Sequence, residues 1–261
     1  MSGDAWAGLA DRFADQAYAS VKGRVRTYVL HHHLLAHLPQ PPATVLDVGG
    51  GAGHQSLPLA RAGYDVTLLD PSPAMLAKAG RRLAGEAVEV RDRVRLVPAR
   101  GEEAAGATGG ERFDAVLCHG VLMYLADPEP LLTSICEAAA PGGLVSLMAL
   151  NARTLAVRPA LEGRWEDAMA AFGARGERGV LGVDTRADTV EELSGALRDS
   201  GVDPLGWYGV WLFTDWLDLP DTTSAEQVDR VAAVELEASR LDPYRQLSRV
   251  FHLLGRKGPR P

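Results

Sequence analysis

The stretch Val45-Leu46-Asp47-Val48-Gly49-Gly50-Gly51-Ala52-Gly53 decides the fold. It joins an apolar strand, Thr44 to Val48, to glycines in front of an expected helix, Ser56 to Ala62. Glycine is needed where a tight turn takes positive φ and where the backbone must approach a ligand closely. The stretch therefore predicts a strand, a ligand-binding turn and a helix, as in nucleotide-binding α/β proteins.

Strands and helices alternate from these glycines to residue 150. Apolar runs predict strands at Asp65 to Leu69, Val94 to Pro98, Phe113 to Cys118 and Leu144 to Leu150, with helices at Pro73 to Leu83 and Pro128 to Ala139. This alternation predicts a parallel sheet with helices on both faces. Later helices are expected at Thr189 to Ser200 and Ser224 to Arg240, and later strands near Leu205 to Phe213 and Ser248 to Leu254. The sheet is then mostly parallel and has seven strands.

The 261 residues are expected to form a single domain, because an α/β fold of this length commonly does. Residues 1–42 would form an N-terminal helical cap, with a helix from Asp11 to Leu38 that has a possible break near Gly23. Residues 43–150 would be the ligand-binding core. Residues 151–187 interrupt the alternation and are interpreted as a helical insertion near the substrate. Residues 188–261 would supply the helices and strands that complete the sheet.

Composition excludes several classes of protein. With 46% hydrophobic and 23% charged residues, the chain is neither wholly disordered nor fibrous. It shows no apolar run of membrane-spanning length and no secretory signal, and Cys118 and Cys136 lack the spacing of a disulfide framework or a metal site. We therefore expect a cytoplasmic protein, with no membrane association and no evident obligate protein partner.

The net charge of −7 argues against broad, non-specific binding of nucleic acid. The charge is uneven, however, because the segment from Arg240 to Pro261 holds six basic residues and one acid. A second basic group is Lys22, Arg24 and Arg26. Either group is most simply a solvated face, but together they leave room for a local anionic partner.

The second strand ends in an acid, Asp70, which is placed to accept hydrogen bonds from both ribose hydroxyls of an adenosine. The alternative is a turn residue in front of Pro71. A nicotinamide enzyme would have G-x-G-x-x-G, but its third glycine position is His54 counted from Gly49 and Ser56 counted from Gly51. A nicotinamide oxidoreductase is therefore disfavoured. A non-catalytic module that binds an adenosine compound remains an alternative.

The pattern Asp-x-Gly-x-Gly-x-Gly, from Asp47 to Gly53, resembles the first motif of class I S-adenosylmethionine-dependent methyltransferases. The segment from Phe113 to His119 resembles their fourth motif, and Ala140-Pro141-Gly142-Gly143 resembles the turn before their fifth strand. The resemblance implies a Rossmann-like fold, S-adenosyl-L-methionine as the cofactor and methyl transfer as the reaction.

A closer resemblance extends along nearly the whole chain. The segments concerned are similar to those of the tRNA 5-carboxymethoxyuridine methyltransferases: Tyr18 to Arg26, Leu125 to Pro128, Ser146 to Ala152, Glu235 to Glu237, Asp242 to Tyr244 and His252 to Lys257. The similarity implies that a carboxylate on a wobble uridine of tRNA is O-methylated. Met123-Tyr124 replaces an expected acid and Trp, and Gly173 to Gly182 is glycine-rich where that family is lysine-rich. A methyltransferase acting on a small molecule, such as a small carboxylic acid, is therefore the alternative.

The resemblance assigns the expected cofactor a set of contacts. Arg26 is the candidate for the methionine carboxylate, because a guanidinium pairs bidentately with a carboxylate. The third strand is followed by residues expected to contact adenine largely through the backbone. The expected cofactor-binding residues are Arg26, Asp47, Gly49, Gly50, Gly51, Asp70, Pro71, Arg100, Gly101, Glu102 and His119.

Acceptor residues are expected at the same edge of the sheet, where open α/β sheets bind ligands. The catalytic candidates are His119, Tyr18, Lys22 and Asn151. Tyr18 and Lys22 share a helix face with Arg26. Arg153 is a further cation for an acceptor carboxylate, and Tyr124 and Trp211 are candidates for stacking on a planar acceptor. For each, an ordinary structural role is the alternative.

No metal role is assigned to His31-His32-His33, because successive helix residues point about 100° apart and cannot face one ion together. A carboxylate acceptor has a pKa of about 4 and is already ionised near pH 7. It therefore needs neither a general base nor a metal, whereas a phenol or catechol would need one.

Overall fold

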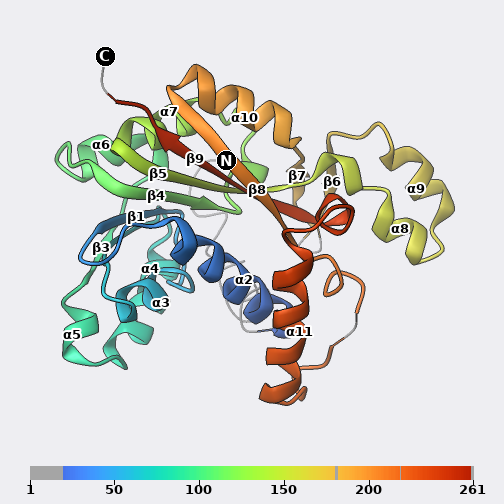
Figure 1. The fold of residues 1–261 in the computed structure, drawn as a ribbon, viewed down its shortest axis with the longest axis horizontal. Coiled ribbons are helices and arrows are strands. Elements are labelled where there is room, and N and C mark those ends of the chain that lie inside the picture. Colours follow the sequence, from blue (N-terminus) through green and yellow to red (C-terminus); the bar gives the residue numbers. More distant parts are fainter. Residues whose placement is uncertain (1–19, 180–181, 218, 260–261) are drawn as a thin grey trace.

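The computed structural model of the protein describes residues 20–179, 182–217 and 219–259 (Figure 1). One sheet has seven strands in the order β3-β2-β1-β4-β5-β9-β8. Its strands are β1 (Thr44–Val48), β2 (Asp65–Leu69), β3 (Val94–Val97), β4 (Phe113–His119), β5 (Ala139–Leu150), β8 (Val202–Val210) and β9 (Val250–Lys257). Strand β9 runs antiparallel to both of its neighbours, β5 and β8, and the pairings among β1 to β5 are parallel. The predicted mostly parallel, seven-stranded α/β sheet is confirmed.

Helices cover both faces of this sheet (Figure 1). One face carries α6 (Ala104–Ala107), α7 (Glu129–Ala138) and α10 (Val190–Asp199). The other carries α2 (Val21–His37), α3 (Ser56–Arg61), α4 (Pro73–Ala84), α5 (Val88–Arg91) and α11 (Ala225–Ala238). Ile135 and Leu197 bury the first layer against the sheet, and Leu34 and Leu59 bury the second. Short 3₁₀ turns are η2 (Gly101–Glu103), η3 (Leu122–Tyr124), η4 (Ala152–Thr154) and η5 (Tyr244–Leu247).

Helix α2 carries the second basic group, Lys22, Arg24 and Arg26. Its first turn is capped by the Ser20 side chain, which accepts a hydrogen bond from the Gly23 amide at 3.2 Å. Val21, Val25 and Val29 are buried at a spacing of four residues, so this face packs against α11 and the adjoining ends of β5, β8 and β9. Helix α2 begins at Val21, after the non-helical cap Ser20, so the chain does leave the helical conformation three residues before Gly23. The earlier part of the predicted helix, from Asp11, lies outside the described residues.

The insertion is only partly helical, which corrects the expectation for residues 151–187. Helices α8 (Val157–Leu161) and α9 (Trp165–Ala171) are followed by a two-stranded hairpin of β6 (Gly176–Arg178) and β7 (Asp184–Arg186). A Cβ on Gly176 would lie 2.2 Å from the Thr185 carbonyl oxygen. The glycine-rich sequence therefore permits a close strand pairing, which its lack of apolar periodicity does not reveal.

The site lies at what we call the carboxyl edge, where β1, β2, β4, β5 and β8 end and the antiparallel β9 begins. The late strands are displaced by about three residues from the predicted bounds. Strand β8 ends at Val210 because Trp211 takes a φ of 60°, outside the extended region. None of the helices in the described ranges is both long and apolar enough to cross a membrane.

Candidate functional site

The glycine turn after β1 is closed by backbone contacts. Gly49, Gly51 and Gly53 take φ values of 68°, 57° and 76°, which side-chain-bearing residues rarely adopt. The Gly49 amide donates to the Leu69 carbonyl at 2.7 Å, which ties the turn to the end of β2. A Cβ on Gly50 would lie 2.9 Å from the Asp47 carboxyl group. The turn therefore needs its glycines for conformation and for space.

Asp70 lies beside this turn, at the end of β2. Its carboxylate accepts hydrogen bonds from the amides of Gly51 at 2.9 Å and Ser72 at 2.8 Å. Burial raises its pKa, and these two amides act in the opposite direction. A carboxylate offers about four acceptor positions, so it retains capacity for the two hydroxyls of a ribose. The neighbouring Pro71 is exposed.

Asp47 lies behind the glycine turn. Its carboxylate is 2% exposed and accepts a hydrogen bond from the Ser56 hydroxyl at 2.5 Å. Burial raises the pKa of Asp47 to about 6, while the Ser56 hydrogen bond and the Arg26 charge oppose the rise. The side chain thus fastens the turn to α3.

The turn after β3 lies against α7. A Cβ on Gly101 would lie 2.3 Å from Leu131 Cδ1, so only glycine lets η2 pack this closely. Arg100 and Glu102 flank it as a partly exposed ion pair at 3.7 Å. The Arg100 amide donates to the Glu103 carboxylate at 3.2 Å, and the Gly101 carbonyl accepts from the Ser134 hydroxyl at 2.8 Å. The adenine contact expected of Arg100, Gly101 and Glu102 stays a prediction.

Arg26 and His119 meet at the centre of the carboxyl edge. Arg26 is 6% exposed, and one of its guanidinium nitrogens lies 3.9 Å from a Cβ placed on Gly120. His119 closes β4, and burial, with a contribution from Arg26, lowers its pKa to about 3. Its Nδ1 is buried without a hydrogen-bond partner among the described residues. Such an atom points to a missing ligand group. A cation beside a neutral acceptor complements the carboxylate and ammonium of an amino acid, so the residues fit the expected cofactor.

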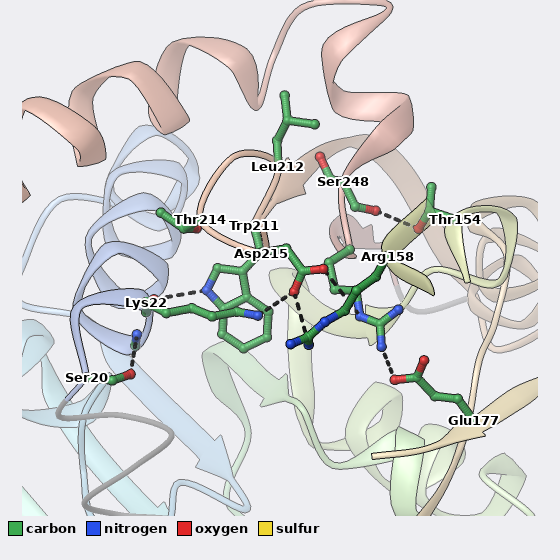
Figure 2. A network of polar contacts seen from close by, with 12 residues as sticks. Ser20, Lys22, Thr154, Arg158, Glu177, Trp211, Leu212, Thr214, Asp215 and Ser248 are labelled. Carbon is green, nitrogen blue, oxygen red and sulfur yellow. Dashed lines mark hydrogen bonds and ion pairs between the residues drawn. The ribbon is translucent and has the colours of Figure 1, made fainter. Parts of the chain in front are cut away.

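A cluster of charged side chains lies farther along the same edge (Figure 2). Asp215 forms an ion pair with Lys22, and its carboxylate lies 3.9 Å from Arg158 and 4.0 Å from Arg249. Arg249 also forms an ion pair with Glu177 of the hairpin. We call Lys22, Arg158 and Arg249 around Asp215 the cationic cluster. It was not predicted as a unit, since its members lie far apart in the sequence.

A cavity of about 470 Å³ opens beside this cluster. Its lining residues are Ser20, Lys22, Arg158, Leu161, Glu162, Thr214, Asp215, Trp216, Leu217 and Leu219. Burial lowers the pKa of Lys22, although Asp215 opposes the shift. Burial, with help from Arg158, lowers the pKa of Arg249 to about 10. Lys22 and Arg249 have therefore lost part of their hydration, and the carboxylates of Asp215 and Glu177 pair with them.

The loop after β8 places Asp215. The Glu235 carboxylate, 2% exposed, accepts hydrogen bonds from the amides of Leu212 at 3.0 Å and Thr214 at 2.7 Å. Trp211 donates its indole N–H to the Lys22 carbonyl at 2.9 Å, and the Lys22 Nζ lies 4.5 Å above its ring. The expected stacking residue thus supports Lys22.

Other candidates lie elsewhere. Asn151 is buried, and its side chain donates to the Ser248 carbonyl and accepts from the Arg153 amide, both at 3.1 Å. Arg153 forms an exposed ion pair with Glu191 at 3.1 Å. Tyr124 lies in η3, and Tyr18 lies outside the described residues. The structure therefore gives Asn151 a local capping role and separates Arg153 from the cationic cluster.

The basic C-terminal segment is not a continuous exposed track in the described part of the chain. Arg249 is 8% exposed and belongs to the cationic cluster. Arg245 binds Asp242 and lies 4.5 Å above the Trp207 ring. The reading of the segment from Arg240 to Pro261 as one solvated basic face is therefore wrong for Arg249, which is buried.

The three consecutive histidines diverge, as expected from helical geometry. His32 is exposed, whereas His33 is buried and contacts His252 and Ser239. Within the described ranges, no group of three or more His, Cys, Asp or Glu side chains has the arrangement of a metal site.

Comparison with known proteins identifies relatives. The methyltransferase domain family matches residues 46–145. The chain is 29% identical to the tRNA 5-carboxymethoxyuridine methyltransferase of Escherichia coli K12, over 95% of this chain and 94% of that protein. It is 32% identical to a ubiquinone biosynthesis O-methyltransferase of Cereibacter sphaeroides, over 68% of this chain and 67% of that protein. The magnesium protoporphyrin IX methyltransferase of Synechocystis, solved with bound SAH, shares the fold with a TM-score of 0.60 at 16% identity, over 90% and 84% of the two chains.

Proposed function

The chain belongs to the S-adenosylmethionine-dependent methyltransferases, and we propose that it methylates a carboxylate, namely the 5-carboxymethoxy group of a wobble uridine in tRNA. The observation that carries the proposal is the cationic cluster beside the cavity at the carboxyl edge. The similarity to the E. coli tRNA enzyme over 95% of the chain supports tRNA as the carrier of that carboxylate. A tRNA acceptor also implies a cytoplasmic protein.

The cofactor would be held by the first half of the carboxyl edge. Asp70 would accept the ribose hydroxyls, Arg26 would pair with the methionine carboxylate, and the backbone of η2 would border the adenine. The bound S-adenosylmethionine supplies a methyl group activated by its sulfonium. The protein contributes alignment and electrostatics.

The acceptor carboxylate would lie against Lys22 and Arg158. Lys22 precedes Arg26 by four residues, about one helical turn or 6 Å along α2, so the cavity is close to the methionine end of the cofactor. Lys22 has three donors and Arg158 has five, of which Asp215 and Glu162 occupy only some. The remaining donors offset the cost of desolvating an anionic acceptor.

A carboxylate acceptor also explains product release. The nucleophilic oxygen attacks the methyl carbon in line, the carbon–sulfur bond breaks, and the products are an ester and S-adenosylhomocysteine. The ester has no charge, so it loses the ion pair that held the acceptor. No proton is removed from the acceptor, in keeping with its ionised state near pH 7 and a pKa of about 4.

A small-molecule O-methyltransferase is the second candidate, supported by the similarity to ubiquinone biosynthesis O-methyltransferases. A phenolic acceptor would need a base. The candidate bases that line this cavity are Lys22, whose pKa is lowered by burial, its partner Asp215, and Glu162.

The experiment supplies labelled cofactor with three acceptors: tRNA carrying 5-carboxymethoxyuridine, the same tRNA carrying 5-hydroxyuridine, and a panel of phenols and small carboxylic acids. We expect label only in the carboxymethoxy nucleoside. Label in small acids alone would remove tRNA and keep the carboxylate, whereas label in phenols alone would overturn both.

A further inference from the structure

A row of buried polar side chains crosses the sheet beneath the cofactor site, from β4 to α11. His119 Nε2 lies 2.8 Å from Ser146 Oγ, which lies 2.6 Å from His252 Nε2. His252 Nδ1 lies 3.2 Å from His33 Nδ1 on α2. His33 Nε2 lies 2.8 Å from Ser239 Oγ, which donates to the Leu236 carbonyl at 2.6 Å. We call these five side chains the histidine chain.

All five members are shielded from water, with His119 at 6%, His33 and Ser239 at 3%, and Ser146 and His252 at 0% exposure. Burial lowers the pKa of His33 to about 3 and that of His252 well below its usual value. The charges that face the chain act in the same direction, since Arg26 acts on His119 and His252 and Arg240 acts on His33. The three imidazoles are therefore neutral, with one donor and one acceptor nitrogen each.

The far end of the chain sets the direction of every hydrogen bond. The Leu236 carbonyl can only accept, so it takes the single hydroxyl hydrogen of Ser239. His33 must then donate from Nε2 to Ser239, and its Nδ1 becomes an acceptor.

The same logic continues toward the site. His252 must donate from Nδ1 to His33, which leaves its Nε2 as an acceptor for the Ser146 hydroxyl. Ser146 has then used its hydrogen, so His119 must donate to it from Nε2. The remaining nitrogen, His119 Nδ1, therefore carries a lone pair and no hydrogen.

That lone pair lies at the end of β4 beside Arg26, buried and with no hydrogen-bond partner in the described ranges. We infer that the histidine chain fixes His119 as a hydrogen-bond acceptor for the α-ammonium group of the cofactor, with Ser146, His252, His33 and Ser239 as positioning residues. Arg26 pairs with the carboxylate of the same amino-acid group, so Arg26 and His119 together bind both of its charged groups. The inference rests on the family's cofactor and is independent of the methyl acceptor.

The arrangement has a chemical consequence. An imidazole of the opposite tautomer would present N–H to an ammonium, and two donors repel each other. An unconstrained histidine can take either tautomer, because the two nitrogens exchange roles with little cost. The histidine chain fixes the tautomer of His119 before the cofactor binds. This preorganisation lowers the free-energy cost of binding.

The first test observes the histidines directly. Nitrogen-15 spectra of the intact protein at about pH 7 should show unprotonated Nδ1 in His119 and His33 and unprotonated Nε2 in His252. Adding S-adenosylhomocysteine should shift the His119 Nδ1 signal as it accepts a hydrogen bond. A protonated Nδ1, or a signal that does not move while the amides of the glycine turn do, would overturn the inference.

The second test uses Ser146→Ala, which interrupts the chain and frees His119 to place its hydrogen on Nδ1. Affinity for S-adenosylhomocysteine should fall about tenfold. Affinity for 5′-methylthioadenosine, which lacks the amino-acid end, should be unchanged. An equal loss for both ligands would mean that the histidine chain has only a structural role.

A further comparison replaces His119 itself. His119→Asn, which keeps an amide oxygen near the position of Nδ1, should retain more of the difference in affinity between the two ligands than His119→Leu. If the variants fail to fold, the spectra of the unmodified protein still decide. Neither test uses the methyl acceptor, so the proposed acceptor stands or falls separately.

Discussion

The two halves of the carboxyl edge are built from different materials. The cofactor half, at the ends of β1 to β4, is shaped mainly by backbone: a glycine turn, η2 and amides directed at Asp70. The acceptor half, at the ends of β5 and β8 and the starts of β9 and α2, is shaped by charged side chains around Asp215. A backbone site is encoded locally because its glycines are required by conformation, whereas a side-chain site exists only after distant segments meet.

The halves also differ in how they keep buried charge. The acceptor half groups three cations with three carboxylates, so each charge has a nearby partner. The cofactor half and its support hold neutral histidines instead, shielded from water. The two strategies respond to different perturbations, and the predictions that follow use this difference.

The largest expected effect is loss of stability in acid. The pKa values of His33, His54 and His119 are lowered to about 3, and that of His252 is lowered as well, so unfolding near pH 5 takes up protons. Asp47, with its pKa raised to about 6, and Asp70, whose pKa is also raised by burial, act in the opposite direction but are two groups against four. Stability should therefore rise with pH between about 4 and 6, with a slope of about 3 kcal/mol per pH unit.

Urea unfolding at a series of pH values measures this slope. His54→Gln should reduce it by about one proton, or 1.4 kcal/mol per pH unit. A flat stability profile over the same range would show that these histidines are protonated in the folded protein, which would also contradict the directed histidine chain.

The second effect concerns the loop that carries Asp215. Glu235→Ala leaves the buried amides of Leu212 and Thr214 without their acceptor and should cost about 3 kcal/mol in free energy of unfolding. The acceptor KM should rise, because Asp215 loses its placement, while affinity for S-adenosylhomocysteine stays unchanged. Denaturant titration and calorimetry measure the two quantities.

The matched control is Glu237→Ala on the same helix. Glu237 forms only an exposed ion pair with Arg240 at 3.4 Å, and its removal should cost below about 1 kcal/mol. Equal losses for the two variants would mean that Glu235 does not organise the loop.

Most of the cofactor half could be predicted from the sequence, because its signals lie close together in the chain. The strand before Gly49 is apolar at Val45, Leu46 and Val48, and the glycines, the acid after β2 and the strand–helix alternation all lie between residues 44 and 150. The parallel pairing among β1 to β5 follows from that alternation. Asp47 shows what the motif leaves open. The motif places Asp47 before the glycine turn, but only the packed structure shows that its carboxylate accepts a hydrogen bond from Ser56.

The acceptor half could be predicted from the sequence only in small part. Lys22 was singled out by its place on the helix of Arg26, but Asp215, Arg158 and Arg249 reach it from distant positions. The histidine chain did leave a signal. Ser146 and His252 are polar residues inside otherwise apolar strands, and buried polar groups need partners. The partners themselves depend on the pairing of β5 with β9, which no local pattern specifies.

The third prediction tests whether a change in the cofactor half leaves the acceptor half unaffected. Asp70→Ala removes a buried carboxylate from the ribose position and should weaken binding of S-adenosylhomocysteine about tenfold. The acceptor KM, measured at saturating cofactor, should not change. Calorimetry gives the first quantity, and a rise in acceptor KM as large as the loss of cofactor affinity would show that the two halves are not separable.

The smallest expected effect lies on the acceptor side. Lys22→Met keeps the length of the side chain and removes its charge, so the acceptor KM should rise about fivefold, a modest change because Lys22 is partly exposed and Arg158 remains. Binding of S-adenosylhomocysteine should be unaffected. Arg24→Met is the matched control, since Arg24 is an exposed cation on the same helix and should leave both quantities unchanged.

The pH dependence of the acceptor KM separates a charge effect of Lys22 from a packing effect. Burial lowers the pKa of Lys22, so its charge is lost at a lower pH than for an ordinary lysine, and the acceptor KM of the unmodified protein should rise in alkali. In Lys22→Met that alkaline rise should be absent. A rise of the same size in both proteins would place the titrating group elsewhere and remove Lys22 from the acceptor site.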